Sequence, residues 1–456
     1  MRPVSLLGVL LDLLQEFDRH HNQPADVRLR KFFKARRFLG SHDRRFVGDG
    51  FYAFLRHEIR GRKRWELWSD RTSCRPPESG RMKHMGTLLA LAADGLFPWS
   101  GKELGDAGAT YAAAQGGGWI DILRRVRSNE FLTDEDWPSD PLERLAYEHS
   151  LPEWMARRLI EMRGEKEAAA LASGLLEGAA VDVRVSLSTV EREVVRKDLE
   201  TTFDVDIEVT PYSPAGLRIR NRINLRQFLN KHPGWIEVQD EASQVAALAC
   251  GPAPGETIID ACAGAGGKTL AFADMTGGDA VLHACDVDAS RLAQLERRAS
   301  ALELRSLTFH EITEDPHQPL PPTLPSSAHL VVVDAPCSGL GSLRRNPDLK
   351  RRYDEDDIAK FAETQYEILR RFANRVRPGG RLAYVTCSIL SDENHHVAHR
   401  FLEKHPEFEI VLPEIASRLP ESVVEDQSFL VLDPSRTETD GFFIALFKKS
   451  RSQAST

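Results

Sequence analysis

The spacing of apolar residues changes character along the 456-residue chain. Over the first 150 residues apolar positions recur at the three- and four-residue intervals of amphipathic helices, and no extended period-two alternation is present. Ser41, His42 and Asp43 have the composition of a helix N-cap before one of these stretches. We therefore predict an all-α domain over residues 1–150, with its clearest helical stretches at 6–17, 29–39, 44–55 and 82–96.

Residues 151–237 mix both periodicities. Helical spacing is found at 153–161, 168–176 and 188–199, and alternating strand-like segments at 181–185, 205–209 and 217–220. This order predicts a small α+β module.

From residue 238 onward, short apolar strands are separated by helical segments. Such an order predicts an α/β domain over 238–456, with a doubly wound and mostly parallel sheet. The expected strands are 256–260, 280–286, 306–311, 329–334, 380–387 and 442–447.

Composition adds limits on the function. Hydrophobic residues make up 41% and charged residues 28% of the chain, as in ordinary globular proteins. The net charge of −8 argues against a uniformly basic nucleic-acid binder, but it allows local basic patches. Asp12 and Glu16 interrupt the apolar run at the start, which favours an amphipathic first helix over a signal peptide. We expect no membrane partner.

Cysteine and histidine spacing argues against a metal site. The six cysteines form no C-x-x-C pair and suit neither zinc nor a disulfide framework, so we expect a cytoplasmic protein. His395, His396 and His399 share one side of a helical segment, but no suitably spaced cysteine or carboxylate accompanies them. We interpret them as a solvated helix start. The cysteines are Cys74, Cys250, Cys262, Cys285, Cys337 and Cys387.

Basic side chains gather in the helical region and after the last strand of the small module. They are either solvated surface charges or contacts to RNA phosphates. The two readings are about equally supported for the helical region, and RNA contact is slightly favoured for the module. The residues are Arg28, Arg30, Lys31, Lys34, Arg36, Arg37, Arg56, Arg60, Arg62, Lys63 and Arg64, then Arg218, Arg220, Arg222 and Arg226.

A glycine-rich stretch, DACAGAGGKTL at 260–270, lies between an expected strand and an expected helix. This is the layout of a nucleotide-type pocket at the carboxyl end of a parallel strand. A Walker loop would need glycine at Cys262, and a dinucleotide fingerprint would need glycine at Thr269. S-adenosylmethionine remains as a nucleoside cofactor, and Asp286 ends the next strand near the spacing of a ribose-binding acid. The alternative is a glycine turn that binds no ligand.

Two later strands end in reactive side chains. The first runs into Asp334 and then Cys337 on a Pro/Gly turn, and the second ends at Cys387. Because strand ends in an open α/β sheet meet at the ligand crevice, we expect one pocket with a cofactor loop, a carboxylate and two thiols.

At these residues the chain resembles the Sun (Fmu), or RsmB-type, family of bacterial S-adenosylmethionine-dependent RNA cytosine-5 methyltransferases. The resemblance covers about residues 154–449. It implies a catalytic domain with a Rossmann-like methyltransferase sheet over 238–456, an RNA-recognition-like module before it, and an N-terminal RNA-binding domain similar to NusB. The motifs are DACAGAGGKT (260–269), DAPCSG (334–339), LRRNPD (343–348), TCS (386–388), QDEAS (239–243) and DGFF (440–443).

The resemblance also implies roles for individual residues. Cys387 would be the nucleophile and Cys337 would assist release, while Asp334 holds the base and Lys268 orients Asp334 or lowers a thiol pKa. The third strand lacks the Gly-Asp ending usual in the family, so Asp315 would take the adenine-side role after a short insertion. The implied cofactor residues are Cys262, Ala263, Gly264, Ala265, Gly266, Gly267, Lys268, Asp286, Asp315 and Asp334.

The expected function is methyl transfer to carbon 5 of a cytosine in RNA, with ribosomal RNA as the first choice of substrate. Transfer RNA is one alternative, and a non-catalytic RNA-binding ribosome assembly factor is another. A DNA cytosine methyltransferase is disfavoured, because its nucleophile lies on a Pro-Cys turn and Thr-Cys-Ser would have no explanation. We expect a cytoplasmic monomer without a metal.

Overall fold

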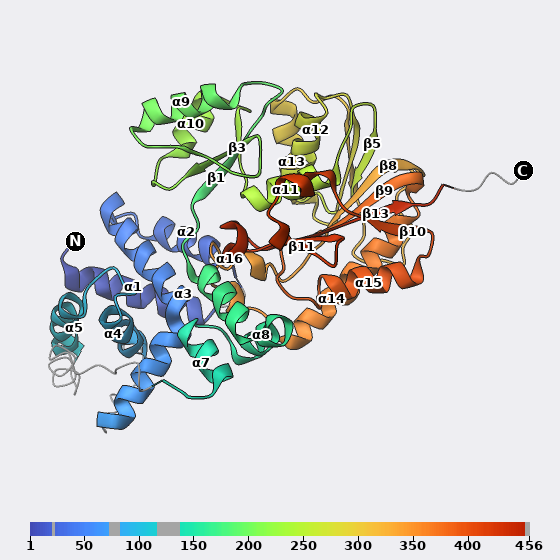
Figure 1. Cartoon of the computed structure of the whole chain (residues 1–456). Coiled ribbons are helices and arrows are strands. Elements are labelled where there is room, and N and C mark those ends of the chain that lie inside the picture. The colour runs from blue at the N-terminus through green and yellow to red at the C-terminus, as the bar shows by residue number, and fades with distance from the viewer. Residues whose placement is uncertain (21–22, 73–82, 116–136, 452–456) are drawn as a thin grey trace, which may run out of the picture. The chain divides into compact units, whose positions relative to one another are not determined.

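The computed structural model describes residues 1–20, 23–72, 83–115 and 137–451 (Figure 1). Cys74 and Met82, which the sequence analysis considered, lie outside the described residues. The chain forms two compact units. One contains residues 1–177 together with 343–354, and the other contains 178–342 and 355–456. The proposed division into domains at 150 and 237 remains a proposal.

Helices alone form the described part of the first unit. The predicted amphipathic start is helix α1, which buries Leu7, Leu10 and Leu14. The expected cap at Ser41 is the first residue of α3, and Asp43 accepts a hydrogen bond from the Gly40 amide at 3.3 Å. The helices are α1 (Pro3–Asp18), α2 (Ala25–Ala35), α3 (Ser41–Thr72), α4 (Met85–Ala93), α5 (Gly101–Gln115), α7 (Pro141–Glu148) and α8 (Glu153–Leu176).

The first unit also contains two segments that lie outside the predicted helical domain of residues 1–150. Helix α8 contains both stretches predicted at 153–161 and 168–176, with a break at Gly164, where φ is 73°. The segment Leu343–Asp354 follows the PCSG turn in sequence, yet it belongs to this unit. Within the unit, Lys350 donates to the carbonyl oxygen of Arg56 at 2.6 Å, and Asp348 accepts from the Ala25 amide at 3.2 Å.

The small sheet of the second unit has the antiparallel order β2-β3-β1-β4. Helices α9 and α10 cover it through a core that includes Val183, Leu199, Leu217 and Phe228. The helix predicted from residue 188 begins only at Arg192, and α10 and β4 were not predicted. The elements are β1 (Val181–Val185), α9 (Arg192–Phe203), β2 (Glu208–Val209), β3 (Gly216–Ile219), α10 (Leu225–Lys231) and β4 (Ile236–Val238).

The large sheet confirms the predicted α/β fold. Its order is β11-β12-β13-β9-β8-β5-β6-β7, with β10 also paired to β13. The five strands from β9 to β7 are parallel, and β13 lies antiparallel beside β9. All six expected strands are present, as β5 (Thr257–Asp260), β6 (Val281–Asp286), β7 (Leu307–Glu311), β8 (Ala328–Asp334), β9 (Val376–Thr386) and β13 (Phe442–Lys449).

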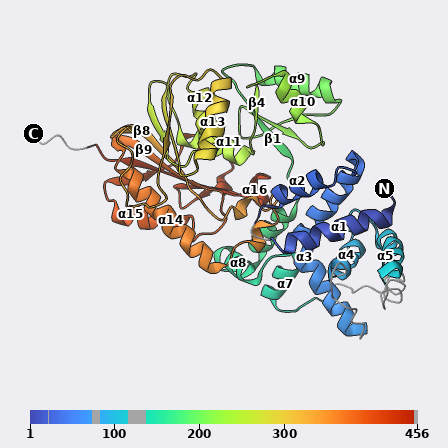
Figure 2. The same cartoon turned by 180° about the vertical axis from the view of Figure 1, so that it is seen from behind.

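Helices cover both faces of this sheet, as Figure 2 shows. Alternate strand residues point to opposite faces, so Val332 packs with α11 and α12 while Val331 packs with α14 and α15. The helices are α11 (Glu241–Cys250), α12 (Gly267–Met275), α13 (Ala289–Ala301), α14 (Glu355–Ala373) and α15 (His395–Lys404).

The antiparallel side carries elements that the sequence analysis did not predict. They are β10 (Phe408–Val411), β11 (Val424–Glu425), β12 (Phe429–Leu432) and the short helix α16 (Pro434–Thr437). Across the residues that the structure describes, no helix is both long enough and apolar enough to cross a bilayer.

Candidate active site

The glycine-rich stretch forms a tight turn from the end of β5 into the first turn of α12. Gly264 and Gly266 have φ values of 55° and 91°, which favour glycine. A Cβ at Gly266 would also lie 2.1 Å from a methyl carbon of Leu295. The turn therefore needs glycine at position 266 both for its backbone conformation and for its packing against α13.

Asp286 connects this turn to the end of β6. Its Oδ2 accepts a hydrogen bond from the Gly264 amide at 2.7 Å, and its Oδ1 accepts from the Asp288 amide at 2.8 Å. The Ala263 amide also donates to the Cys285 carbonyl at 2.8 Å. A carboxylate and a glycine turn are thus held together, the arrangement that suits the ribose of a nucleoside cofactor.

Asp260 is a site residue that the sequence analysis did not assign. It is buried at the end of β5 and accepts a hydrogen bond from Thr269 Oγ1 at 2.6 Å, which joins β5 to α12. Burial raises the pKa of its carboxyl to about 7, and the charge of Asp334 adds to this increase. A strand residue at the start of a glycine turn could have been selected from sequence, but its burial could not.

Lys268 and Asp334 form an ion pair beside the turn. Lys268 Nζ lies 2.7 Å from Asp334 Oδ2, and the Lys268 side chain is only 6% exposed. Burial by itself lowers the pKa of Lys268, but the negative charge of Asp334, with a smaller contribution from Cys387, raises it overall. A cation is therefore held at the ends of β5 and β8.

The two predicted thiols meet at the ends of neighbouring strands. β8 and β9 are parallel, with Asp334 opposite Val385, so that the residues after each strand come together. Cys337 Sγ lies 3.3 Å from Cys387 Sγ, which is a hydrogen-bonding contact and much longer than the ~2.05 Å of a disulfide. Both thiols are partly exposed. They are available as a reduced pair.

The charges around this pair differ between the two thiols. The hydrogen bond with Cys387 raises the pKa of Cys337, and burial and the nearby Glu393 carboxylate raise it further. Glu393 is fully buried and accepts hydrogen bonds from the residues that follow both cysteines. It was not identified from sequence, because it lies in a loop without a motif of its own.

The remaining cysteines have the surroundings of packing residues. Cys250 and Cys285 are fully buried, and burial raises the pKa of both thiols, that of Cys250 to about 12. Burial likewise raises the pKa of Cys262 well above its usual value, so only its backbone is suited to a ligand.

Asp315 forms its hydrogen bonds within its own loop and not with the other predicted site residues. It is exposed in the loop after β7, and its carboxylate accepts hydrogen bonds from the His317 amide at 2.9 Å and Gln318 Nε2 at 3.3 Å. These contacts belong to its own turn. Its role at the adenine side of the cofactor remains a prediction.

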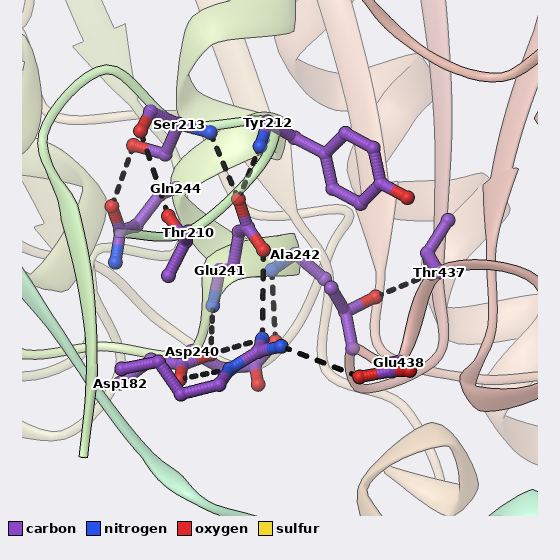
Figure 3. Close-up of polar contacts among 12 residues, drawn as sticks. Asp182, Thr210, Tyr212, Ser213, Asp240, Glu241, Ala242, Gln244, Thr437 and Glu438 are labelled. Carbon is purple, nitrogen blue, oxygen red and sulfur yellow. Dashed lines mark hydrogen bonds and ion pairs between the residues drawn. The ribbon is translucent and has the colours of Figure 1, made fainter. Parts of the chain in front are cut away.

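The surroundings of Arg218 contradict the prediction that this arginine contacts RNA. Its side chain is 7% exposed and donates to Asp182 Oδ1 at 2.8 Å and Oδ2 at 3.0 Å. Glu241 also lies within 3.5 Å, and it accepts from the amides of Tyr212 and Ser213 (Figure 3). The prediction that Arg218 contacts RNA is wrong, because its charge is neutralised inside the protein.

The basic residues of the helical unit divide into two groups. Arg30 pairs with Asp26, and Arg36 pairs with Glu16, both at 2.8 Å. Arg56 donates to backbone carbonyls, while Arg60, Arg62 and Arg64 pair with Asp94 or Glu58. By contrast, Lys31, Lys34 and Arg37 are exposed and have no carboxylate within ion-pair distance among the described residues.

Of the three histidines in the first turns of α15, His396 and His399 are exposed, as predicted, whereas His395 is not. His395 is 17% exposed, lies 3.2 Å from Glu425 and packs edge-on against Phe429 and Phe443. Among the residues with described positions, no group of three or more His, Cys, Asp or Glu side chains could hold a metal ion.

Comparison with known proteins identifies similar chains. Residues 247–448 match the family model described as 16S rRNA methyltransferase RsmB/F. The chain is 32% identical over 332 residues to the probable ribosomal RNA small subunit methyltransferase B of Bacillus subtilis, covering 72% of each protein. It is 29% identical over 422 residues to its counterpart in Synechocystis, covering 90% of this chain and 92% of that one. The crystal structure of PH0851 superposes with a TM-score of 0.75 at 25% identity, over 98% of this chain and 99% of that one.

Proposed function

Since the chain belongs to the RsmB/F family of S-adenosylmethionine-dependent RNA methyltransferases, we propose that it methylates carbon 5 of a cytosine in RNA through a covalent cysteine–cytosine adduct. The pair of thiols 3.3 Å apart carries this proposal. Other methyl acceptors, such as ring nitrogens, are nucleophiles already and need no thiol. Carbon 5 of cytosine is a poor nucleophile, and a thiol adding to carbon 6 overcomes this.

The residues of the glycine turn fit S-adenosylmethionine. Glycine at positions 264 and 266, both with positive φ, allows a ligand to approach the backbone closely, and Asp286 offers a buried carboxylate at the end of β6. Cys262 to Gly267 would contact the cofactor through the backbone, and Asp286 would accept hydrogen bonds from the ribose hydroxyls. When bound, the cofactor supplies an electrophilic methyl group.

In the first step we assign the attack to Cys387. Its thiolate adds to carbon 6, which makes carbon 5 enamine-like and therefore nucleophilic enough to take the methyl group. Lys268 carries a positive charge that interacts with Cys387, whereas Glu393 opposes ionisation of Cys337. The raised pKa of Cys337 therefore argues against Cys337 as the attacking thiolate.

Asp334 and Lys268 would hold the base during this step. Lys268 fixes Asp334 Oδ2 at 2.7 Å, and the Asp334 side chain is 33% exposed. The carboxylate can therefore accept a hydrogen bond from the exocyclic amino group of cytosine, which is a donor. This orients the ring so that carbon 6 faces Cys387.

Release reverses the first bond. A base removes the proton from carbon 5, its electron pair restores the carbon 5–carbon 6 double bond, and Cys387 leaves as a thiolate. Cys337 lies in hydrogen-bonding contact with Cys387 and would assist this elimination. One thiol thus serves attack and the other serves release.

The relatives support ribosomal RNA of the small subunit as the substrate, because several are named for it. Transfer RNA is the alternative with the same chemistry. A non-catalytic RNA-binding assembly factor is the alternative of another class, and the thiol pair with the Lys268–Asp334 ion pair argues against it.

Bisulfite sequencing of total RNA tests substrate and activity together. Wild-type and deletion strains are compared, and the deletion strain is complemented with the wild-type chain or with Cys387→Ala. We expect one 5-methylcytosine in 16S rRNA to be lost on deletion and restored only by the wild-type chain. If the deletion instead removes a 5-methylcytosine from transfer RNA, the substrate is transfer RNA. If no 5-methylcytosine is lost, the non-catalytic assembly factor is favoured.

A further inference from the structure

The two thiol-bearing loops are bonded to one buried carboxylate. Ser338 follows Cys337, and Ser388 follows Cys387. Ser338 Oγ donates to Glu393 Oε2 at 2.5 Å, and Ser388 Oγ donates to the same oxygen. The Ser338 amide donates to the other oxygen, Oε1, at 2.8 Å. Two loops 50 residues apart in sequence are therefore tied to a single side chain.

The carboxylate is itself fixed by neighbouring elements. Gln365 of α14 donates through Nε2 to Glu393 Oε1 and to the Pro336 carbonyl, both at 3.0 Å. The Tyr384 hydroxyl of β9 lies 3.0 Å from Gln365 Oε1 and also donates to the Glu393 carbonyl. The donors to the Glu393 carboxylate among the described residues are neutral and buried, so this network has one well-satisfied arrangement.

We propose that Glu393 is a positioning residue for methyl transfer, whose carboxylate holds the Cys337 and Cys387 loops at the spacing that lets one thiol attack and the other assist release. The inference rests on the proposed function for the roles of the two thiols. Displacing a reacting group by about 1 Å commonly costs on the order of 100-fold in rate. A direct link between the residues after both thiols limits such displacement.

Besides holding the two loops in place, Glu393 affects the ionisation of Cys337 through its charge. The charged or titratable groups that act on the thiol pair include Glu393, Tyr384 and Cys387 at Cys337, and at Cys387 they include Lys268, which pairs with Asp334. Glu393 therefore disfavours a thiolate at Cys337. This effect can be measured without RNA.

Glu393→Gln removes the charge with little change in volume. The amide oxygen can still accept from the Ser338 amide and Gln365, and the amide nitrogen can donate to the two serine hydroxyls, which can turn to accept. We expect the pH profile of Cys337 alkylation by iodoacetamide, followed by peptide mass spectrometry, to move to lower pH. We expect kcat for methyl transfer to fall by about tenfold or more, with KM for RNA and cofactor within about twofold.

Glu241→Gln is the matched control. Glu241 is also a fully buried carboxylate that accepts hydrogen bonds from two backbone amides, but its partners, Tyr212, Ser213 and Arg218, lie outside both thiol loops. We expect it to leave the alkylation profile and kcat unchanged. If Glu393→Gln does not fold, the double variant Ser338→Ala, Ser388→Ala removes both hydroxyl links and should lower kcat in the same way.

A Glu393→Gln protein with wild-type kcat and an unchanged Cys337 profile would overturn the proposal. The proposed function and the positioning role of Glu393 can be contradicted independently of each other. If the wild-type enzyme methylates no RNA, the proposed function fails, whereas the alkylation profiles still report whether Glu393 controls Cys337.

Discussion

At the scale of single residues, the site distinguishes two thiols that look equivalent in sequence. Cys337 and Cys387 each follow a parallel strand, and their sulfurs touch at 3.3 Å. Their electrostatic surroundings separate them, because Glu393 acts on Cys337 and Lys268 acts on Cys387. The assignment of attack to Cys387 and release to Cys337 has a direct chemical test.

We expect Cys337→Ala to accumulate a covalent protein–RNA complex. Cys387 can still add to carbon 6, but elimination has lost its assisting thiol, so the adduct persists. Denaturing electrophoresis with labelled RNA should show a shifted band for Cys337→Ala, and none for Cys387→Ala or the double variant. A stable adduct with Cys387→Ala alone would reverse the assignment, and no adduct with any variant would favour the non-catalytic reading.

Asp286 gives a second residue-scale prediction. Asp286→Ala should weaken S-adenosylmethionine binding by about 1–3 kcal/mol, because charge-assisted hydrogen bonds to the ribose are lost. The Gly264 amide also loses its acceptor, which loosens the turn. Isothermal titration calorimetry measures the change. Asp288→Ala is the control, since Asp288 caps α13 by accepting from the Ser290 amide, and unchanged affinity in folded Asp286→Ala would contradict the prediction.

At the scale of elements, the short helix α2 and the turn after it expose cations that have no partner carboxylate among the described residues. Lys31, Lys34 and Arg37 are exposed, and Phe38 beside them is 68% exposed. Cations next to an open aromatic ring suit RNA, since phosphates and unstacked bases can both be bound. Arg30 is set aside, because it already pairs with Asp26.

Replacing Lys31, Lys34 and Arg37 by Glu should weaken RNA binding and flatten its dependence on salt. Each lost phosphate contact should reduce the slope of log affinity against log salt by about 0.7–0.9. Filter binding at several salt concentrations measures this, and cofactor affinity should not change. The charge-matched control replaces Lys360, Arg370 and Arg400, which pair within α14 and α15. If the salt dependence of RNA binding is unaltered, the three residues are ordinary surface charges that do not contact RNA phosphates.

At the scale of the molecule, the small sheet and the large sheet belong to one unit that buried ion pairs connect. Arg184 of β1 pairs with Asp274 of α12 at 3.0 Å, and the Ser188 amide donates to the same carboxylate at 2.9 Å. Arg218 joins Asp182 of β1 to Glu241 of α11. The helix that begins at the glycine turn is thus attached directly to the small module.

We expect Arg218→Met to destabilise the protein by about 3–5 kcal/mol, since Asp182 and Glu241 would remain buried without their counter-charge. Arg220→Met is the control, because Arg220 pairs with Glu208 at an exposed site, where such pairs contribute about 0–1 kcal/mol. Urea unfolding at pH 7 compares the two. Equal losses of stability would mean that the buried pair has no special role.

The pattern of residues alone determined the sheet and the strand ends that carry the candidate site residues. The five parallel strands and the buried antiparallel strand β13 are mostly apolar runs, so all six expected strands could be located. The carboxyl ends of the parallel strands placed Asp286, Asp334, Cys337 and Cys387 at one edge. These features depend on local spacing and on a topology that parallel sheets share. The short antiparallel strands β10, β11 and β12 lack such runs and were not predicted.

Only the tertiary structure decided which charges are neutralised and which side chains fix the site. Arg218 looked like a surface cation until its partners at 182 and 241 were in place, and Glu393 gained its role from donors 55 and 5 residues away. The segment 343–354 likewise joined the helical unit rather than the sheet around it. Burial and hydrogen-bond partners are properties of distant residues brought together, and local periodicity carries no record of them.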